Sequence, residues 1–442
     1  MPVKAISSVE RLQVVADADG LTSRAGTALV AGVADRVGLT AGLSAALEGL
    51  RERRSRHDPG RVVRDLAVAL ADGGDCLADL RALRDQEPLF GEVASDATAW
   101  RTLAVLDERR LRAIRAARAE ARRRVWERAG APERVILDLD GTLLTAHSEK
   151  EGAAGTYKGG FGFHPLLCYE ATSEEALAGL LRPGNAGFNT ASDHIELLEQ
   201  ALAQLPKETR TPGLLVRADR AGATHAFLDH VAERGFRFSV GLDLTEPVRE
   251  AILALPEQAW QPALAQDGAD REGAWVAELA LELAGWPAGT RAICRRERPH
   301  PGAQLAFTDD NGYRFQVFLT NQQGKRIARL EQLHRARAAC EDRIRCGKDS
   351  GLRNLPFRAF APNAAWLELV LIGQDLLVWP QRLLLADGEL ARCEPKRLRY
   401  RLLHVAARLT RHARRLVLHL PRAWPWQREL LRAFERLRAL PA

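Results

Sequence analysis

The sequence predicts an α/β protein in which a central mixed sheet is flanked by helical regions at both ends of the chain. Three observations support this fold class. Residues 1–130 are rich in Ala, Leu and Arg, and their apolar residues recur at helical spacing. From Val135 the chain changes to short apolar strands, two of which, 135–140 and 213–219, run directly into carboxylates. Helical periodicity returns at Ile327.

The strands and helices between Val135 and Leu244 follow a definite order. The expected elements are strands at 135–140, 165–170 and 177–182, a helix at 190–205, a strand at 213–219, a helix at 225–234 and a strand at 236–244. This order matches the ribonuclease-H-like arrangement, in which the first and fourth strands lie side by side. Asp140 and Asp219 would then sit near one another at adjacent strand ends.

The rest of the chain divides around this unit. Strand-like stretches at 291–298 and 313–321, with Asp310-Asn311-Gly312 as a turn, predict a β-rich insertion. We therefore expect a helical DNA-binding region at 1–130, the first part of the core at 131–245, the insertion at 246–325, the final catalytic helix at 326–360 and a helical basic region at 361–442. A plain helical domain is an equally good interpretation of the N-terminal region, because short helices and tight turns do not require a DNA reader.

Composition favours a polyanionic partner and gives no sign of a membrane span. The 442 residues carry a net charge of +7, with an isoelectric point near 9.3. The most apolar stretch, Trp366–Trp379, contains Glu368 and Asp375 and is short for a span, so a buried helix is expected. The start of the chain has no apolar signal-peptide core. Six scattered cysteines lack zinc-ligand spacing, which fits a reducing cytoplasm.

The sharpest local pattern lies in the helix predicted to end near residue 348. Its side chains His334, Arg337, Glu341, Arg345 and Lys348 are spaced three or four apart and share one face. A carboxylate framed by cations on one face is suited to hold a metal ion while its neighbours bind phosphates. A solvated charged face with ordinary ion pairs is the alternative interpretation.

This spacing resembles the signature of many bacterial insertion-sequence transposases: tyrosine, two residues, arginine, three residues, glutamate, six residues and lysine, with His334 replacing the tyrosine. Longer segments along nearly the whole chain resemble the DDE transposase group one family, in particular its insertion-sequence-1380-like members. Among them are HSEKEGAAGTYKGGFGFHPLL, LRPGNAGFNTASDH, VRADRAGATHAF and CEDRIRCGKDSGLRNLPF. The resemblance implies a ribonuclease-H-like core with a β-rich insertion before the final helix.

The resemblance also implies a catalytic and metal-binding triad of Asp140, Asp219 and Glu341. Three clustered carboxylates repel one another, and two Mg²⁺ ions are suited to bridge them, with Mn²⁺ as a substitute. Asp138 lies two residues before Asp140 on the same strand face and is expected to support the site. The implied activity is metal-dependent DNA cleavage followed by strand transfer.

Basic residues beside the triad are expected to contact DNA phosphates. Arg337 and Lys348 match the family motif, and Arg345 shares their helix face. Arg220 stands where close relatives are expected to have a small polar residue, and its charge would hold a phosphate or weaken metal binding. His334 departs from the motif tyrosine, which puts a phosphate contact at this position in question.

Several further residues are candidates with weaker support. His164 and Asn185 lie in family-like segments and are expected to support the site or contact DNA. Trp260, Trp275 and Trp286 fall in the insertion, where they would either stack on an unpaired base or, as is commoner for any one tryptophan, pack in the core. The implied partners are double-stranded DNA, both terminal inverted repeats and target, and a second copy of the chain that pairs two element ends.

Two other functions compete with this hypothesis. The hexapeptide Asp138–Leu143 also resembles the first motif of haloacid-dehalogenase-type phosphatases, with Asp138 as nucleophile and Asp140 as general acid/base. That enzyme would have no use for Glu341, and its expected motif order fits this chain poorly. The second competitor is a catalytically inert, DNA-binding transposase remnant, which the presence of all three acids argues against.

Overall fold

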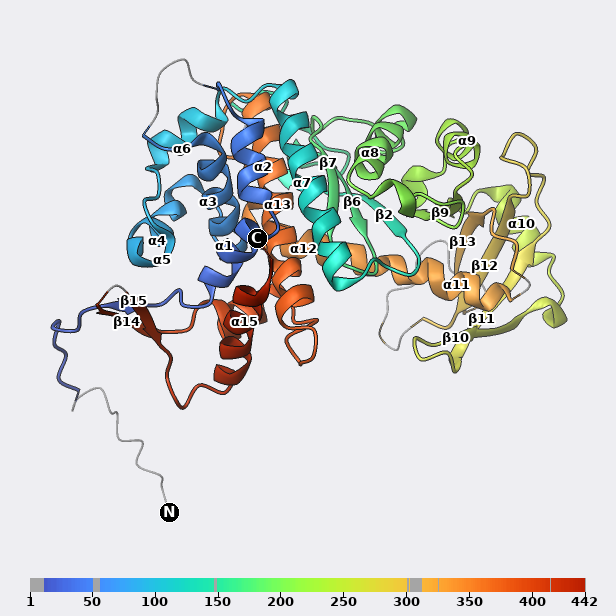
Figure 1. Ribbon diagram of the computed structural model, residues 1–442. Helices are drawn as coiled ribbons and strands as arrows, with labels where there is room; N and C mark the ends of the chain where they lie inside the picture. The colour runs from blue at the N-terminus through green and yellow to red at the C-terminus, as the bar shows by residue number, and fades with distance from the viewer. Residues whose placement is uncertain are drawn as a thin grey trace.

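A nine-stranded mixed sheet runs from the middle of the molecule to the end opposite the N-terminal helices (Figure 1). The computed structural model describes residues 12–50, 56–146, 149–299, 302, 312–324, 326–413 and 415–441. In spatial order the strands of the sheet are β10 (Gln261–Leu264), β11 (Asp270–Leu279), β12 (Arg291–Glu297), β13 (Arg314–Thr320), β9 (Arg237–Leu242), β8 (Leu215–Ala218), β2 (Ile136–Gly141), β6 (Leu166–Glu170) and β7 (Ala176–Leu180).

Five of these strands confirm the arrangement expected for the core. β2 is antiparallel to β6, which is antiparallel to β7, whereas β2, β8 and β9 run parallel to one another. The first and fourth strands of this unit, β2 and β8, are therefore neighbours as predicted. Helix α8 (Ala191–Ala203) lies in the connection from β7 to β8, and α9 (His225–Glu233) lies in the connection from β8 to β9. β8 and the middle of β2 are buried because helices cover the sheet, and their residues are apolar except for Arg217 and Asp138.

The insertion continues the same sheet. β13 pairs antiparallel with β9, and β12, β11 and β10 follow in antiparallel order. Helix α10 (Glu246–Leu253) leads into the insertion, and α11 (Ile327–Arg335) leaves it by packing across β10 and β11. A small separate core forms there, from Ala263, Ala274, Val276, Ile293, Phe318, Ile327, Ala328 and Leu330. Strand residues far from the core unit are thus connected to it without a break in hydrogen bonding.

The N-terminal region is helical as predicted, apart from one short strand. Its helices are α1 (Thr27–Arg36), α2 (Leu39–Ala46), α3 (Pro59–Ala71), α4 (Arg81–Arg84), α5 (Glu87–Phe90), α6 (Asp96–Leu103) and α7 (Glu108–Ala129). The side chain of Asp58 caps α3 and Pro59 occupies its first turn, a combination that fixes the start of a helix. The long helix α13 (Phe360–Leu384) packs against α3, α7 and α1, and also against β7. The ends of the chain therefore build one helical layer together (Figure 1).

Helix α13 confirms the buried helix predicted for Trp366–Trp379. Among the described residues, no single helix is both long and apolar enough for a membrane span. The bent pair α1 and α2, which meet at 65°, satisfies those two criteria together, by length and composition only.

The C-terminal region is not helical throughout, which corrects the prediction for 361–442. After α14 (Pro395–Leu398), strands β14 (Ala407–His412) and β15 (Arg415–His419) form a hairpin, and β1 (Leu21–Thr22) pairs with β14. The cross-strand pair Thr410 and Val417 joins two β-branched residues, which favour a pleated strand. Helical periodicity resumes only in α15 (Gln427–Ala439).

A buried network of ion pairs fastens this helical layer to the sheet. Arg118 of α7 donates to Asp375 of α13 at 2.8 Å and to Glu368 at 2.9 Å. Arg122, one turn later, bonds to Asp375 and lies 3.2 Å from Glu175, the residue before β7. Arg118, Arg122, Glu175 and Asp375 have no exposed side-chain surface. Such a network is satisfied only when α7, α13 and β7 are in place together.

Candidate active site

Two acids meet at one edge of the sheet. Asp140 is near the end of β2, and Asp219 directly follows β8. Because the two strands are parallel neighbours, with Leu139 opposite Ala218, these aspartates stand at the same level. The side chain of Asp219 also accepts a hydrogen bond from the backbone N–H of Ala221 at 3.0 Å, which turns the chain away from the strand. The adjacency expected from the strand order is present.

The third acid arrives on the helix that leaves the insertion. Helix α11, the short helical turn η6 (Ala336–Ala338) and α12 (Ala339–Gly347) follow one another, and α12 packs on β2 and β6. Cys340 and Ile344 are buried on the inner side of α12, so Glu341 projects outward with 69% of its side chain exposed. The charge of Glu341 acts on Asp140 by raising its pKa. The structure thus brings all three predicted acids to one edge.

Arg337 lies among these acids. Its Nη1 donates to Oδ2 of Asp140 at 3.2 Å, and its Nη2 is 3.9 Å from Oε1 of Glu341. Burial disfavours the charged guanidinium, yet the carboxylates of Asp140 and Asp219 outweigh it, so the pKa of Arg337 is raised. The arginine predicted to contact phosphate is therefore held by the acids in this structure.

Asp140 carries the clearest electrostatic signature of the site. Burial raises its pKa to about 6; Arg337 opposes this shift, and the charges of Asp219 and Glu341 add to it. The site therefore has more negative charge than the arginine balances. Its donor set, three carboxylates, is the all-oxygen set that Mg²⁺ and Mn²⁺ prefer. Within the described ranges, the single trio of metal-ligand side chains with donor atoms inside 4.8 Å is Asp75, Cys76 and Asp79, so the three acids here are more widely spaced.

Asp138 does not share this open edge. It is buried, and both its oxygens accept from Arg217 of β8, at 2.6 and 2.7 Å. Arg217 also donates to the backbone oxygen of Leu333 in α11. Asp138 and Arg217 thus tie β2 and β8 to α11. Sequence reasoning missed Arg217, although an arginine within the apolar strand Gly-Leu-Leu-Val-Arg-Ala-Asp was the available signal.

His334 packs against the sheet and does not offer a positive charge to DNA. Its ring stacks on Phe318 with centroids 4.3 Å apart, and its Nδ1 lies 2.9 Å from Oγ of Ser239. Burial lowers the pKa of His334 to about 3, and the nearby arginines lower it further. A neutral, stacked imidazole carries no charge for a phosphate, which agrees with the question raised by the replacement of the motif tyrosine.

The other predicted cations, Lys348 and Arg345, differ in their exposure and in their bonding partners. Lys348 donates from Nζ to the backbone oxygen of Leu143 at 3.2 Å, just beyond β2, and burial lowers its pKa. Arg345 is half exposed and pairs with Asp342 and Glu394, at 3.3 and 2.8 Å. Lys348 therefore contacts the chain three residues beyond Asp140, whereas Arg345 pairs with carboxylates outside the triad.

Arg220 stands at the mouth of the site. It follows Asp219 directly, and its side chain is 64% exposed. Its Nη1 pairs with Asp243 at 2.7 Å, which raises the pKa of Arg220. The guanidinium thus points to a carboxylate outside the triad.

Comparison with known proteins identifies the chain. A family model described as transposase DDE domain group 1 matches residues 6–442. The chain belongs to this family. It is thus a DNA transposase, which agrees with three acids at one sheet edge. A solved structure described as the piggyBac transposase synaptic complex with hairpin DNA is similar, with 10% identity, a TM-score of 0.42 and coverage of 85% of this chain and 77% of that one. No curated protein matches.

His164 borders the acids of the transposase on the side of β6. A Cβ built on Gly141 would lie 3.0 Å from Nε2 of His164, so glycine at this position leaves room for the ring. Nδ1 of His164 is 3.4 Å from the backbone oxygen of Ala186 and 3.3 Å from Arg182. Burial lowers the pKa of His164 and Arg182 lowers it further. Asn185 is exposed in the same loop.

Arg182 is a second residue that sequence reasoning missed. Only 3% of it is exposed, and it donates to the backbone oxygens of His164 at 2.9 Å and Gly187 at 2.9 Å. It also pairs with Asp193 of α8 at 2.8 Å. Arg182 therefore fixes the loop after β7 against the start of α8. Its position at the end of a predicted strand gave no signal of this role.

The tryptophans of the insertion are engaged within the transposase. Trp260 and Trp275 lie on the guanidinium of Arg296, with centroid distances of 4.4 and 5.1 Å. Trp286 stacks on His225 with ring centroids 4.0 Å apart. These contacts agree with the packing interpretation of the three rings.

Proposed function

We propose that the transposase uses Asp140, Asp219 and Glu341 to cleave double-stranded DNA at insertion-sequence ends and to join those ends to target DNA. The observation that carries this proposal is the convergence of the three acids, from β2, β8 and α12, at one sheet edge, where the mutual repulsion helps to raise the pKa of Asp140 to about 6. The order and directions of β7, β6, β2, β8 and β9 support a ribonuclease-H-like core.

The acids are suited to hold two Mg²⁺ ions, with Mn²⁺ as a substitute. Divalent ions bound by carboxylates of this kind activate a water or a DNA 3′-hydroxyl and stabilise the leaving 3′-oxygen. Asp140 and Asp219 would supply the fixed ligands, since both belong to sheet strands or their immediate ends. Glu341 is the exposed member, so it is the ligand that can adjust when DNA arrives.

Basic residues around the acids would orient the DNA backbone. Arg337 and Lys348 are nearest, through their contacts with Asp140 and Leu143. Arg345 and Arg220 are exposed at the border of the site and would exchange their present carboxylate partners for phosphates. The proposed DNA partners are terminal inverted repeats and target duplex. A homodimer is proposed for the DNA complex, because two element ends must be joined together.

The test is a cleavage and joining assay on duplex DNA that carries the sequences flanking the gene, with Mg²⁺ or Mn²⁺. Glu341→Gln should bind this DNA with unchanged affinity and lose cleavage by at least about 100-fold, because a metal ligand contributes at least as much as the residues that orient it. Asp342→Asn is the matched control, since Asp342 is the next residue and is equally exposed. It should cleave like the wild type.

Other outcomes separate the competing functions. Binding of element ends without cleavage by the wild type would identify an inert remnant. Cleavage that survives in Glu341→Gln would exclude the proposed triad. The phosphatase hypothesis is not favoured, because its nucleophile would be Asp138, which is buried and bound by Arg217 through both oxygens.

A further inference from the structure

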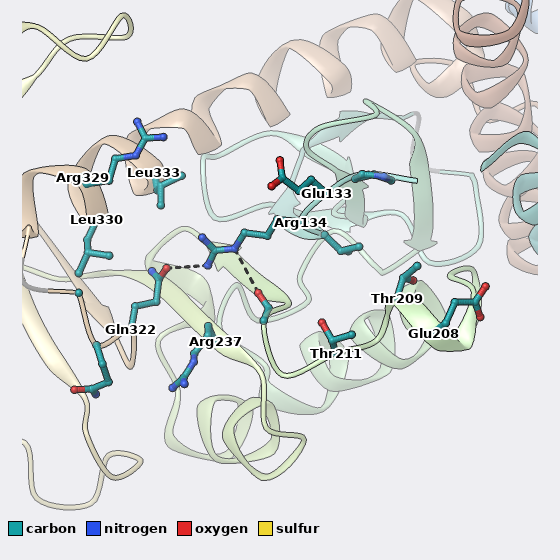
Figure 2. Close-up of a pocket in the computed structure, with 15 residues that line it drawn as sticks. Glu133, Arg134, Glu208, Thr209, Thr211, Arg237, Gln322, Arg329, Leu330 and Leu333 are labelled. Carbon is teal, nitrogen blue, oxygen red and sulfur yellow. Dashed lines mark hydrogen bonds between the residues drawn. The ribbon is translucent and has the colours of Figure 1, made fainter. Parts of the chain in front are cut away.

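A large pocket opens at the sheet edge opposite the acids (Figure 2). Its volume is about 790 Å³. Arg134 and Gly213 precede β2 and β8, and Arg237 begins β9, so the pocket is at the start of the three parallel strands. Asp140 and Asp219 are at the other ends of those strands. The first turns of α11, which include Arg329, also line the pocket.

Arg134 is the central basic group of this pocket (Figure 2). Its Nη2 donates to Oε1 of Gln322 at 3.0 Å, and its Nε donates to the backbone oxygen of Gly213 at 3.4 Å. Both acceptors are neutral, so they orient the guanidinium without cancelling its charge. Among the described residues Nη1 of Arg134 has no hydrogen-bond acceptor, so it keeps free donor capacity at the pocket.

Two further arginines, Arg237 and Arg329, line the pocket and also donate to neutral oxygens. Arg237 donates to the backbone oxygen of Asn321 at 3.3 Å. Arg329 donates to the side-chain oxygen of Gln332. Both side chains belong to exposed residues. In the part of the chain that the structure describes, none of the three pocket arginines has an ion-pair partner.

Three arginines and two glutamates line the pocket, so the charge of its lining is net positive. Burial lowers the pKa of Arg134, and the nearby charges of Arg217 and Arg237 lower it further. Glu133 and Glu208 also line the pocket, but both are exposed, and in the described ranges neither pairs with its arginines. Guanidinium groups that are oriented by neutral acceptors and not paired with a carboxylate are suited to bind phosphate oxygens.

We propose that this pocket is a second phosphate-binding site, which holds the DNA backbone apart from the bond that is cut. The inference rests on the proposed function, because it takes DNA as the phosphate source. Six residues of strand separate Arg134 from Asp140, or about 20 Å at roughly 3.3 Å per residue. For DNA whose axis runs parallel to these strands, a rise of about 3.4 Å per base pair puts the phosphate held by the pocket about six base pairs from the scissile phosphate.

The test measures the affinity for duplex DNA carrying the gene-flanking sequences, across a series of salt concentrations and without divalent ions. The double variant Arg237→Gln, Arg329→Gln removes two exposed charges and leaves the oriented Arg134 in place. Its affinity should fall about tenfold, and the slope of log affinity against log salt should become less steep by about one to two. Arg237→Lys with Arg329→Lys should restore the salt slope, because the charge is kept.

The matched control is Arg428→Gln with Arg438→Gln, two exposed arginines of α15. An equal loss of affinity in this control would show that total charge alone matters and would overturn the proposal. Unchanged binding in the pocket variant would overturn it as well. Phosphate ethylation should interfere with wild-type binding about six base pairs from the cut, and this interference should disappear in the pocket variant.

Two further arms separate this inference from the proposed function and from another phosphate source. If the wild type binds the DNA and Glu341→Gln abolishes cleavage while the pocket variant is unaffected, the pocket inference alone fails. If the wild type does not bind the DNA, the proposed function and the inference fail together. Pyrophosphate is the small-molecule probe. If Arg134→Gln and Arg237→Gln weaken pyrophosphate binding but leave the affinity for DNA unchanged, the pocket binds a free phosphate ligand and not the DNA backbone, and the proposal is wrong.

Discussion

Arg337 and Asp140 form an ion pair of 3.2 Å at the point where the three acids converge. The same guanidinium is 3.9 Å from Glu341, so one side chain lies between a largely buried acid on β2 and an exposed acid on α12. The arginine therefore supplies the positive charge that these carboxylates require before DNA or metal is bound. A divalent cation has to compete with it for the same oxygens.

Removal of this competitor should strengthen metal binding. Arg337→Ala should bind Mn²⁺ several-fold more tightly than the wild type at pH 8 in the absence of DNA, measured by titration calorimetry. The physical reason is that Asp140 loses its present cationic partner. The same variant should cleave DNA more slowly, because Arg337 also serves the phosphate. Arg345→Ala, a change on the outer surface of α12, should leave metal affinity unaltered. Equal or weaker Mn²⁺ binding by Arg337→Ala would contradict the competition.

Asp140 should make stability depend on pH in a defined direction. Its folded pKa of about 6 is above the ordinary 3.8, so the folded state holds a proton that the unfolded chain releases between these values. The free energy of unfolding should therefore fall as pH rises through this window. Asp140→Asn, which cannot ionise, should be more stable than the wild type at pH 8 by up to about 3 kcal/mol, from about two pKa units.

Urea unfolding of both proteins at pH 8 and pH 4 checks this prediction. The difference should vanish at pH 4, where Asp140 is protonated in the wild type. Asp342→Asn, an exposed site on α12, serves as the control and should show no such pH dependence. If the wild type were more stable than Asp140→Asn at pH 8, the raised pKa of Asp140 would be contradicted. Metal-dependent cleavage should also decline below about pH 6, because a cation must then displace the proton.

The buried ion network should be far more sensitive to mutation than the surface pairs. Asp375→Asn leaves Arg118 and Arg122 without their shared carboxylate in a fully buried position. The expected loss is about 3–5 kcal/mol of unfolding free energy, because one carboxylate charge is removed from the buried network while both arginines stay charged. Glu120→Gln breaks exposed pairs on the same helix α7 and should cost less than about 1 kcal/mol. Comparable losses in both variants, measured by urea unfolding, would contradict this account.

His334 should not report on pH in the range where histidines usually titrate. With a pKa of about 3, its ring is neutral throughout pH 5 to 8. His334→Phe preserves the stack on Phe318 and loses the contact with Ser239, at a cost of about 1 kcal/mol. DNA affinity of this variant should keep the wild-type pH profile. A change in that profile between pH 5 and 8 would show that the imidazole becomes charged when DNA binds.

The core strands were predictable because each one is short, apolar and bounded by turn residues. The order of those strands predicted that β2 and β8 are neighbours, and with it the meeting of Asp140 and Asp219. The regular spacing on the final helix pointed to Glu341. The spacing could not predict which way His334 faces, because the helical turn η6 interrupts the helix between His334 and Glu341. The spacing rule assumed an unbroken turn.

Pairings between distant segments were the other limit. Arg217 and Asp138 are 79 residues apart, so nothing local in either segment indicated that both oxygens of the aspartate are occupied. The same holds for the insertion, whose strands were expected but whose union with the core sheet depends on the pair β13 and β9. The hairpin at 407–419 was missed because its stability comes from pairing with itself and with Leu21–Thr22. Helical periodicity around it carried no information on that pairing.

The network between α7 and α13 has a consequence for how the chain matures on the ribosome. Arg118 is synthesised 257 residues before Asp375, its buried partner. At a synthesis rate of about 5–20 residues per second, the early helices wait roughly 13 to 50 seconds for the carboxylates that neutralise them. During this interval Arg118 has neither Glu368 nor Asp375 to pair with. The helical layer is therefore a late product of translation, and truncated chains that stop before α13 should be cleared as unfolded protein.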